Sequence, residues 1–174
     1  VEKILQYMDE KNGGFKGAPK FPQLYIFDTI FYFYNKNKKN TFLDVVRKLL
    51  NNISSKGIYD HLGGGISRYT VDEKWIVPHF EKMLYDNILF VRTVNNYLVN
   101  KQDKKLNDKL IQTINFINNE FLNDKNLLGS AYDADSEGIE GKYYVWSNEE
   151  IKGLLGNDID CLLYTSDAAD DDHC

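Results

Sequence analysis

Residues 57–86 contain the side chains with the clearest capacity for chemistry. This segment combines three consecutive glycines, two histidines, an arginine, a tryptophan and five carboxylates, and it has little helical periodicity. Glycines cost backbone entropy, and polar groups among apolar ones must be hydrogen-bonded or solvated. Because such a composition is costly if folding is its only task, it is typical of a segment that lines a functional site.

The two histidines of this segment, His61 and His79, are the catalytic candidates, because an imidazole can donate or accept a proton near neutral pH. Arg68 offers a fork of donors for hydroxyl groups, and Trp75 offers an apolar ring for the face of a pyranose. The glycines at 63–65 would let backbone N–H groups approach a ligand closely. The sequence therefore predicts a pocket suited to a sugar, with these substrate-binding candidates: Asp60, Arg68, Tyr69, Trp75, Glu81 and Asp86.

Structural roles are an alternative for several of these residues. His79 could cap the helix that follows it, and Glu81 and Asp86 would then suit the positive end of the helix dipole. Arg68 could pair with a carboxylate and hold a hairpin together. The three glycines are not a phosphate-binding loop, because the G-x-x-x-x-G-K-[ST] pattern is absent and no strand precedes them. We therefore expect no cofactor.

A second polar segment, residues 132–146, adds Asp133 and Asp135 as catalytic candidates and Glu137 as a substrate-binding candidate. The run D-A-D-S-E-G begins like a calcium-binding loop, but its twelfth position is Tyr144, where a bidentate glutamate is required. We therefore predict no metal site. Two alternatives are left open, a loop that faces a substrate and a tight turn held by Asx-type hydrogen bonds.

The apolar pattern predicts an all-α chain with short β-hairpins. Helices are expected over residues 24–34, 41–53, 82–99 and 106–122, and an earlier helix is expected to end at the glycine pair 13–14. Ser147 and Glu150 have the spacing of a capping box that starts another short helix. Residues 66–78 and 132–146 alternate like short hairpins, the second with 142–146 as its returning strand.

Three motifs make the chain recognisable: GGFKGAPKFP at 13–22, VPHFEKMLYDN at 77–87 and YDADSEGIEGKYYVW at 132–146. On these motifs, residues 1–155 resemble the thioredoxin-domain-containing family related to spermatogenesis-associated protein 20. The resemblance implies an (α/α)6 toroid like that of six-hairpin glycosidases and N-acylglucosamine 2-epimerases, with the 132–146 loop bordering the central cavity. It also implies a thioredoxin-like domain in cis, ahead of the first motif. No such domain is visible here, and the chain has no CxxC.

The expected architecture is a fragment of such a toroid, because the chain supplies fewer than half of the helices of a closed ring. We assign residues 1–160 to this partial (α/α)6 domain. The last fourteen residues, CLLYTSDAADDDHC, differ abruptly in composition and resemble a translated sequencing-adapter read-through. The prediction for 161–174 is a non-native tail, with a genuine solvated acidic tail as the alternative.

Charge and composition exclude several classes of protein. Of the net charge of −5, four charges belong to the tail, so the remainder is nearly neutral and has no footprint for nucleic acid or an anionic membrane. Both cysteines also lie in the tail, which excludes a disulfide framework elsewhere. No apolar run approaches the roughly 20 residues of a membrane span. We expect a cytoplasmic protein.

The function that fits these observations best is that of a carbohydrate-active domain. The prediction is acid/base chemistry of the sugar epimerase or isomerase type on a small-molecule carbohydrate. Two alternatives remain open at this point. One is a glycoside hydrolase with paired carboxylates, and the other is a non-catalytic binding scaffold attached to a redox domain.

Overall fold

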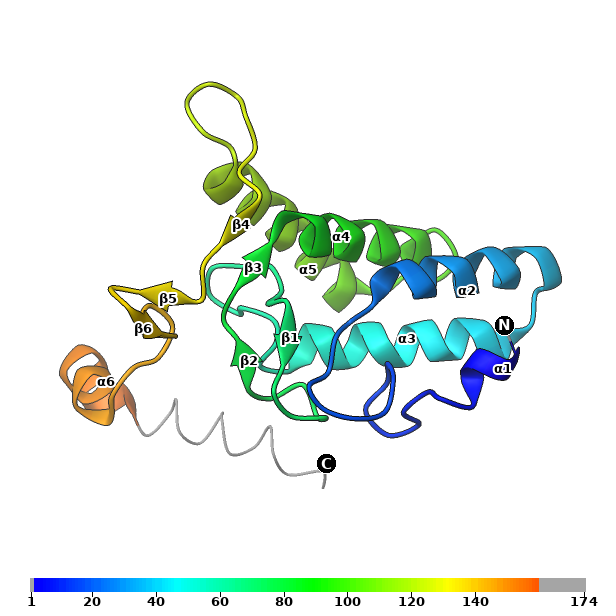
Figure 1. Cartoon of the computed structure of the whole chain (residues 1–174), viewed down its shortest axis with the longest axis horizontal. Helices are drawn as coiled ribbons and strands as arrows, with labels where there is room; N and C mark the ends of the chain where they lie inside the picture. Colours follow the sequence, from blue (N-terminus) through cyan, green and yellow to red (C-terminus); the bar gives the residue numbers. More distant parts are fainter. Residues whose placement is uncertain (1, 160–174) are drawn as a thin grey trace. The chain divides into compact units, whose positions relative to one another are not determined.

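The structure is a computed structural model that describes residues 2–159 (Figure 1). It divides into two compact units, Val1–Ala134 and Asp135–Cys174, each described by itself here. The described residues are mostly helical, as the sequence predicts. The helices are α1 (Glu2–Leu5), α2 (Leu24–Asn37), α3 (Asn40–Ser55), α4 (Leu84–Leu98), α5 (Lys104–Phe116), a π-helical turn (Ile117–Phe121), α6 (Asn148–Leu155) and a 3-10 turn (Gly156–Asp158).

The strands within the described residues are short and pair two by two in antiparallel fashion. They are β1 (Tyr69–Thr70) with β2 (Pro78–His79), β3 (Lys82–Met83) with β4 (Ala131–Tyr132), and β5 (Asp135–Ser136) with β6 (Ile139–Glu140). The β1–β2 pair confirms the predicted first hairpin.

The first unit is a layer of helices with a hairpin at one end. Helices α2 and α3 pack together, α4 packs on α2, and α5 packs on α4 and α3. Figure 1 shows β1, β2 and β3 gathered at one end of these helices. The apolar stripes of α2 and α3 face inward, which is why both helices form where their periodicity predicts. Their contribution to the core is Leu24, Phe27, Ile30, Phe31, Phe42, Leu43, Val46, Leu49, Leu50 and Ile53.

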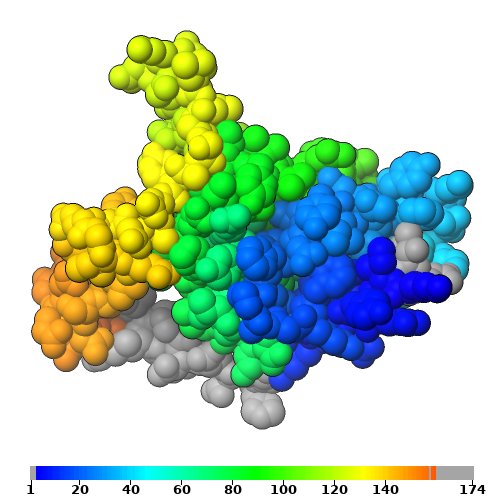
Figure 2. Space-filling view, in the orientation of Figure 1, coloured from blue at the N-terminus to red at the C-terminus, as the bar shows by residue number. Residues whose placement is uncertain are grey.

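The N-terminal segment corrects one expectation. Helix α1 ends at Leu5, not at the glycine pair, because residues 8 and 15 instead form an antiparallel bridge across a turn. In this turn Gly13 lies so close to α3 that a Cβ would come within 2.9 Å of the Leu49 backbone. The segment then runs beside β1, where Lys20 and Thr70 form a second bridge. Figure 2 shows this N-terminal part (blue) against the segment that carries the hairpin (green).

Two further boundaries differ from the sequence prediction. Residues 82–83 form β3, so α4 begins at Leu84, because this segment pairs with β4 almost fifty residues later. In the second unit the returning strand is β6, not residues 142–146, because Glu137 and Gly138 take left-handed backbone conformations and close the turn early. The capping box of Ser147 and Glu150 is confirmed at α6. The predicted tail, residues 161–174, lies outside the described residues.

Candidate functional site

A pocket of about 360 Å³ lies where the starts of α2 and α4 meet the segment that leads into β1. We call it the Arg68–Asp86 pocket. Arg68 lies one residue before β1, and Asp86 lies in the first turn of α4. The pocket combines aromatic, amide and charged side chains, the combination that small-molecule sites use. Its lining is Phe21, Pro22, Gln23, Tyr25, Arg68, Tyr85, Asp86 and Leu89.

A buried amide next to Asp86 fixes the geometry of this pocket. The Asn87 side chain is 0 % exposed. Its Oδ1 accepts a hydrogen bond from the Ile66 backbone N–H at 2.8 Å, and its Nδ2 donates to the carbonyl oxygens of Ile66 (3.1 Å) and Met83 (2.9 Å). Because a buried amide with all three bonds made is costly to disturb, Asn87 ties the first turn of α4 to the segment before β1.

Arg68 is held from one side by Glu81. Its Nη1 donates to Glu81 Oε2 at 2.9 Å, and the Arg68 backbone N–H donates to the Glu81 carbonyl at 2.8 Å. The Nε atom of the same guanidinium is buried, and within the described residues it has no hydrogen-bond partner. Asp86 Oδ2 is also buried and has no hydrogen-bond partner within the described residues.

These two atoms are complementary, because Nε–H is a donor and a carboxylate oxygen is an acceptor. A buried polar group without a partner costs about 1–3 kcal/mol. A hydroxyl group can accept a hydrogen bond from such a donor or donate one to such an acceptor. The two atoms therefore leave unused hydrogen-bonding capacity beside the pocket.

The Asp86 carboxyl is also tuned for proton transfer. Burial raises its pKa to about 6. The Arg68 charge and a hydrogen bond with the Tyr85 side chain oppose the increase, and the Glu81 charge adds to it. A carboxyl group that changes protonation close to neutral pH can act as a general acid or base. Asp86 is thus able to exchange protons as well as to bind a ligand.

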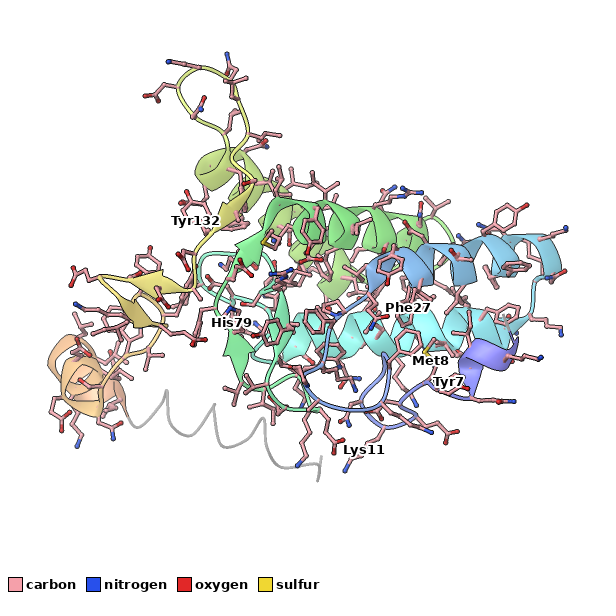
Figure 3. The ribbon with its side chains drawn as sticks, viewed as in Figure 1. Tyr7, Met8, Lys11, Phe27, His79 and Tyr132 are labelled. Atoms are coloured by element: carbon pink, nitrogen blue, oxygen red, sulfur yellow. The ribbon has the colours of Figure 1, made fainter. Side chains whose placement is uncertain are left out.

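A series of aromatic rings extends from the pocket to His79. The imidazole of His79 stacks on the Tyr69 ring with centroids 4.7 Å apart and planes at 14°, and Tyr69 lies 4.7 Å from the Phe21 ring. Figure 3 shows His79 on the hairpin, in β2, whereas Phe27 lies among the helices. The alternative role of His79 as a helix cap is wrong, because α4 begins at Leu84 and Met83 is its N-cap residue.

Trp75 does not fit the predicted role of a sugar platform. Its side chain is 0 % exposed, its Nε1 donates to the Asn12 carbonyl at 2.9 Å, and the Lys20 ammonium lies 5.0 Å from the ring centroid. Lys20 is itself 2 % exposed and forms an ion pair with Asp9 at 2.6 Å. We correct the prediction for Trp75, because the ring is fully buried and its indole N–H is already bonded within the core.

Asp60 and the glycines 63–65 organise the fold. The Asp60 carboxylate accepts hydrogen bonds from the backbone N–H groups of Leu62 and Gly63 and from the Lys82 ammonium at 2.6 Å. A Cβ on Gly64 would come within 2.9 Å of the Gln112 carbonyl oxygen. We expected these glycines to approach a ligand. The structure instead shows their loop packed closely on α5.

His61 contacts a different set of residues from His79. Its Nε2 lies 3.1 Å from the Lys56 carbonyl oxygen, and its Nδ1 lies 3.3 Å from Lys109 Nζ on α5. None of the hydrogen bonds or ring contacts given for His61 within the described residues involves the Arg68–Asp86 pocket. The structure thus brings Arg68, Glu81 and Asp86 together, with Tyr69 and His79 on the adjoining ring series, and leaves His61 with α5.

The candidates of the second polar segment are divided between the two units. Asp133 follows β4 in the first unit and is exposed, whereas Asp135 and Glu137 belong to the second unit. Glu137 forms an ion pair with Lys142 across the turn. Their predicted roles stay predictions. Within residues 2–159 no group of three or more histidine, cysteine or acidic side chains is placed to hold a metal ion.

The sequence analysis missed the part of the pocket that α2 contributes. Gln23 has a left-handed backbone conformation (φ 46°) directly before α2, which is uncommon for a residue other than glycine. Tyr25 and Tyr85 line the same pocket. No sequence signal pointed to this contribution, because the left-handed conformation of Gln23, directly after the first motif, is visible only in the structure.

Comparison with solved structures defines the class of fold. The chain is similar to cellobiose 2-epimerase from Bacillus thermoamylovorans, with a TM-score of 0.65 and 19% identity over 92% of this chain and 51% of that one. It is also similar to cellobiose 2-epimerase from Spirochaeta thermophila, with a TM-score of 0.67 and 16% identity over 76% and 36% of the two chains. The described residues thus have the fold of part of an (α/α)6 toroid, and the predicted fold class is confirmed.

Comparison with curated proteins gives closer relatives, although no protein-family model matches the chain. The chain is 32% identical to human spermatogenesis-associated protein 20 over 164 residues and 34% identical to the uncharacterized protein B0495.5 of Caenorhabditis elegans over 163 residues. These matches cover 88% and 86% of the chain, which spans about a fifth of the length of either relative (21% and 22%). The resemblance to the spermatogenesis-associated protein 20 relatives is confirmed.

Within the described residues, none of the helices combines the length and apolar character needed to cross a bilayer.

Proposed function

We propose that the Arg68–Asp86 pocket binds a sugar and that the domain carries out acid/base chemistry of the epimerase or isomerase type. The observation that carries this proposal is the buried and unpartnered pair formed by Arg68 Nε and Asp86 Oδ2. Sugar hydroxyls can accept a hydrogen bond from the first atom and donate one to the second. Arg68 also forms an ion pair with Glu81 at 2.9 Å, so the position of its guanidinium is held before a ligand binds.

The chemistry follows from the protonation behaviour of Asp86. Epimerisation at a carbon next to a carbonyl group removes a proton from that carbon and returns a proton to its opposite face. A carboxyl with a pKa of about 6 is ionised at neutral pH, so it can take up the proton and release it again. Because one group serves one face of the sugar, a second proton carrier is required. His79, which adjoins the pocket through Tyr69 and Phe21, is our candidate.

The class of substrate is suggested by the structural neighbours, two of which are described as cellobiose 2-epimerases. We propose an aldose with a free reducing end, either a monosaccharide or a β-linked disaccharide. Phe21 and Tyr25 on the pocket wall supply apolar rings for the face of such a sugar. Trp75, which the sequence suggested for this role, is replaced by these two residues.

The test is exchange of the hydrogen at C2 in heavy water. The full-length protein is incubated with cellobiose, glucose or mannose in D₂O, and NMR follows loss of the C2–H signal and appearance of the epimer. We expect exchange that Asp86→Asn reduces at least 100-fold, because removing a general acid/base costs about 10²–10⁴ in rate. Asp124→Asn, at an exposed carboxylate outside the pocket, is the matched control.

Two other outcomes would contradict the proposal. Release of glucose from cellobiose without C2 exchange would identify a glycoside hydrolase. If the folded protein shows no C2 exchange and no sugar-dependent change in melting temperature, the function is that of a binding scaffold.

A thioredoxin-like domain in cis and a cytoplasmic location remain predictions. The domain assignment, with residues 1–160 as a partial toroid and 161–174 as a non-native tail, also remains a prediction. Re-sequencing of the source locus on both sides of this chain tests the first and last of these. We expect further helical pairs beyond residue 160 and a CxxC-bearing domain upstream of residue 1. A frame that ends at residue 174 could not close the ring and would contradict the proposed catalysis.

A further inference from the structure

A second cluster of titratable groups lies on α5, outside the Arg68–Asp86 pocket. Lys109 Nζ lies 3.3 Å from His61 Nδ1 and 3.1 Å from Gln112 Oε1. The same ammonium lies 4.3 Å from the centroid of the Tyr59 ring. This places a histidine and a lysine, which ordinarily repel each other when both are charged, in direct contact.

The hydrogen bonds assign the state of His61. Its Nε2 lies 3.1 Å from the Lys56 carbonyl oxygen, which can only accept, so Nε2 carries the proton. Nδ1 of the neutral ring is then an acceptor and faces the lysine. A nucleophile, a base within hydrogen-bond reach and a third group that orients the base are the arrangement that activates side-chain nucleophiles. Lys109, His61 and the Lys56 carbonyl have this arrangement.

The electrostatics agree with this assignment. Burial lowers the pKa of Lys109, although the Asp60 charge opposes the change. Burial also lowers the pKa of His61, and the neighbouring Lys109 charge lowers it further. Both shifts favour the uncharged forms, and an uncharged amine is the nucleophile.

Lys109 is accessible from a cavity. A pocket of about 460 Å³ lies between the end of α3 and the first turns of α5, and Lys109 forms part of its wall. Ser54, Ser55 and Asn51 line the α3 side. Lys105 lines the α5 side together with Asp103, Leu106 and Asp108. This volume accepts a small activated acyl group together with part of its leaving group.

We propose that Lys109 is a nucleophilic lysine, with His61 as its base, that is acylated by small thioesters or acyl phosphates in the pocket between α3 and α5. One ammonium proton passes to Nδ1 of His61 and on to solvent. The free amine then attacks the acyl carbon, a C–N bond forms, and the C–S or C–O bond to the leaving group breaks. Thiol or phosphate leaves, and the second amine proton is released as the amide forms.

The test compares two lysines on the same helix. The folded chain is treated at pH 7.5 with acetyl phosphate in one arm and acetyl-CoA in the other, and mass spectrometry measures site-specific acetylation rates. Lys105, one turn earlier, exposed and on the same pocket wall, is the internal control. We expect Lys109 to react at least about fivefold faster, since a lowered pKa raises the fraction of free amine at a given pH. A response to one donor only identifies the leaving group that the pocket accepts.

Variants of His61 separate its role as a base from its role in packing. His61→Gln retains an acceptor for the lysine but cannot take up a proton, and His61→Ala retains neither. Both are expected to bring the Lys109 rate down to that of Lys105. If Lys109 reacts no faster than Lys105 in the unaltered chain with both donors, the proposal is overturned, whether or not the variants fold. If the fast rate survives in a folded His61→Gln variant, His61 is not the base.

Discussion

Asp86 is the residue whose environment makes the strongest prediction. Its folded-state pKa of about 6 lies above the value of about 4 for an unfolded aspartate. The folded chain therefore binds the proton more tightly. Its contribution to stability is full below pH 4 and is lost as the pH rises to about 6. At neutral pH the folded chain carries an ionised and partly desolvated carboxylate.

Asp86→Asn should therefore stabilise the chain in a pH-dependent way. An amide has no charge to bury, so the difference in melting temperature between variant and parent should grow by roughly 3–6 °C between pH 4.5 and pH 7.5. Thermal unfolding followed by circular dichroism at both values measures it. A gain that is equal at the two pH values would contradict a raised pKa. Asp124→Asn, at the surface, should show no such trend.

For single residues, the sequence predicted which side chains lie close together better than it predicted which side chains are buried. Arg68, Glu81 and Asp86 were grouped because they lie close in the chain, and the structure gathers them in one place. The role predicted for Trp75 was wrong, because an indole or an ammonium such as that of Lys20 can be solvated or buried and local sequence does not decide which. Their burial depends on one another and on partners more than fifty residues apart in the chain.

The glycine loop before β1 is the element whose packing is least tolerant of change. Gly65 has a φ of +81°, and a Cβ there would lie 2.6 Å from the Phe116 ring and 2.8 Å from Asn87 Oδ1. Gly65→Ala should lower the free energy of unfolding by about 2–4 kcal/mol, from left-handed strain plus overpacking. It should also disturb the Arg68–Asp86 pocket, because Asn87 anchors the first turn of α4.

Gly17→Ala is the matched control for this substitution. Gly17 also has a positive φ (+103°), but nothing lies within 4 Å of a Cβ placed there. It should show the strain without the overpacking, so chemical denaturation should find it less destabilised than Gly65→Ala. Equal losses would mean that contact with α5 does not explain the three glycines.

Long helices were the most predictable elements, and short strands the least. The stripe of α3 and the capping box of α6 are local signals, and both helices form where these signals lie. By contrast, β3 is two residues long and exists only because β4 pairs with it. The closing turn of the second hairpin was also missed, since it depends on a left-handed Glu137 that no side-chain preference requires.

At the scale of the molecule, the hydrophobic core belongs to one unit. The core cluster draws on residues between 4 and 110, all within Val1–Ala134. Three motifs in order sufficed to predict the (α/α)6 class, because that class depends on the succession of helices and loops. The placement of the pocket was not predictable, since it needs α2, α4 and the segment before β1 to converge in space.

A chain that ends after Ala134 should therefore fold and unfold cooperatively. It keeps the core cluster and the β3–β4 pair, so its melting temperature should lie within about 5 °C of that of the longer chain. Removing Trp146 leaves Trp75 as its tryptophan, and Trp75 is 0 % exposed. Its fluorescence should be blue-shifted in the native state and move to the red in one step with the loss of helical signal. Emission typical of a solvated indole before unfolding would show that the first unit needs the second one for its core.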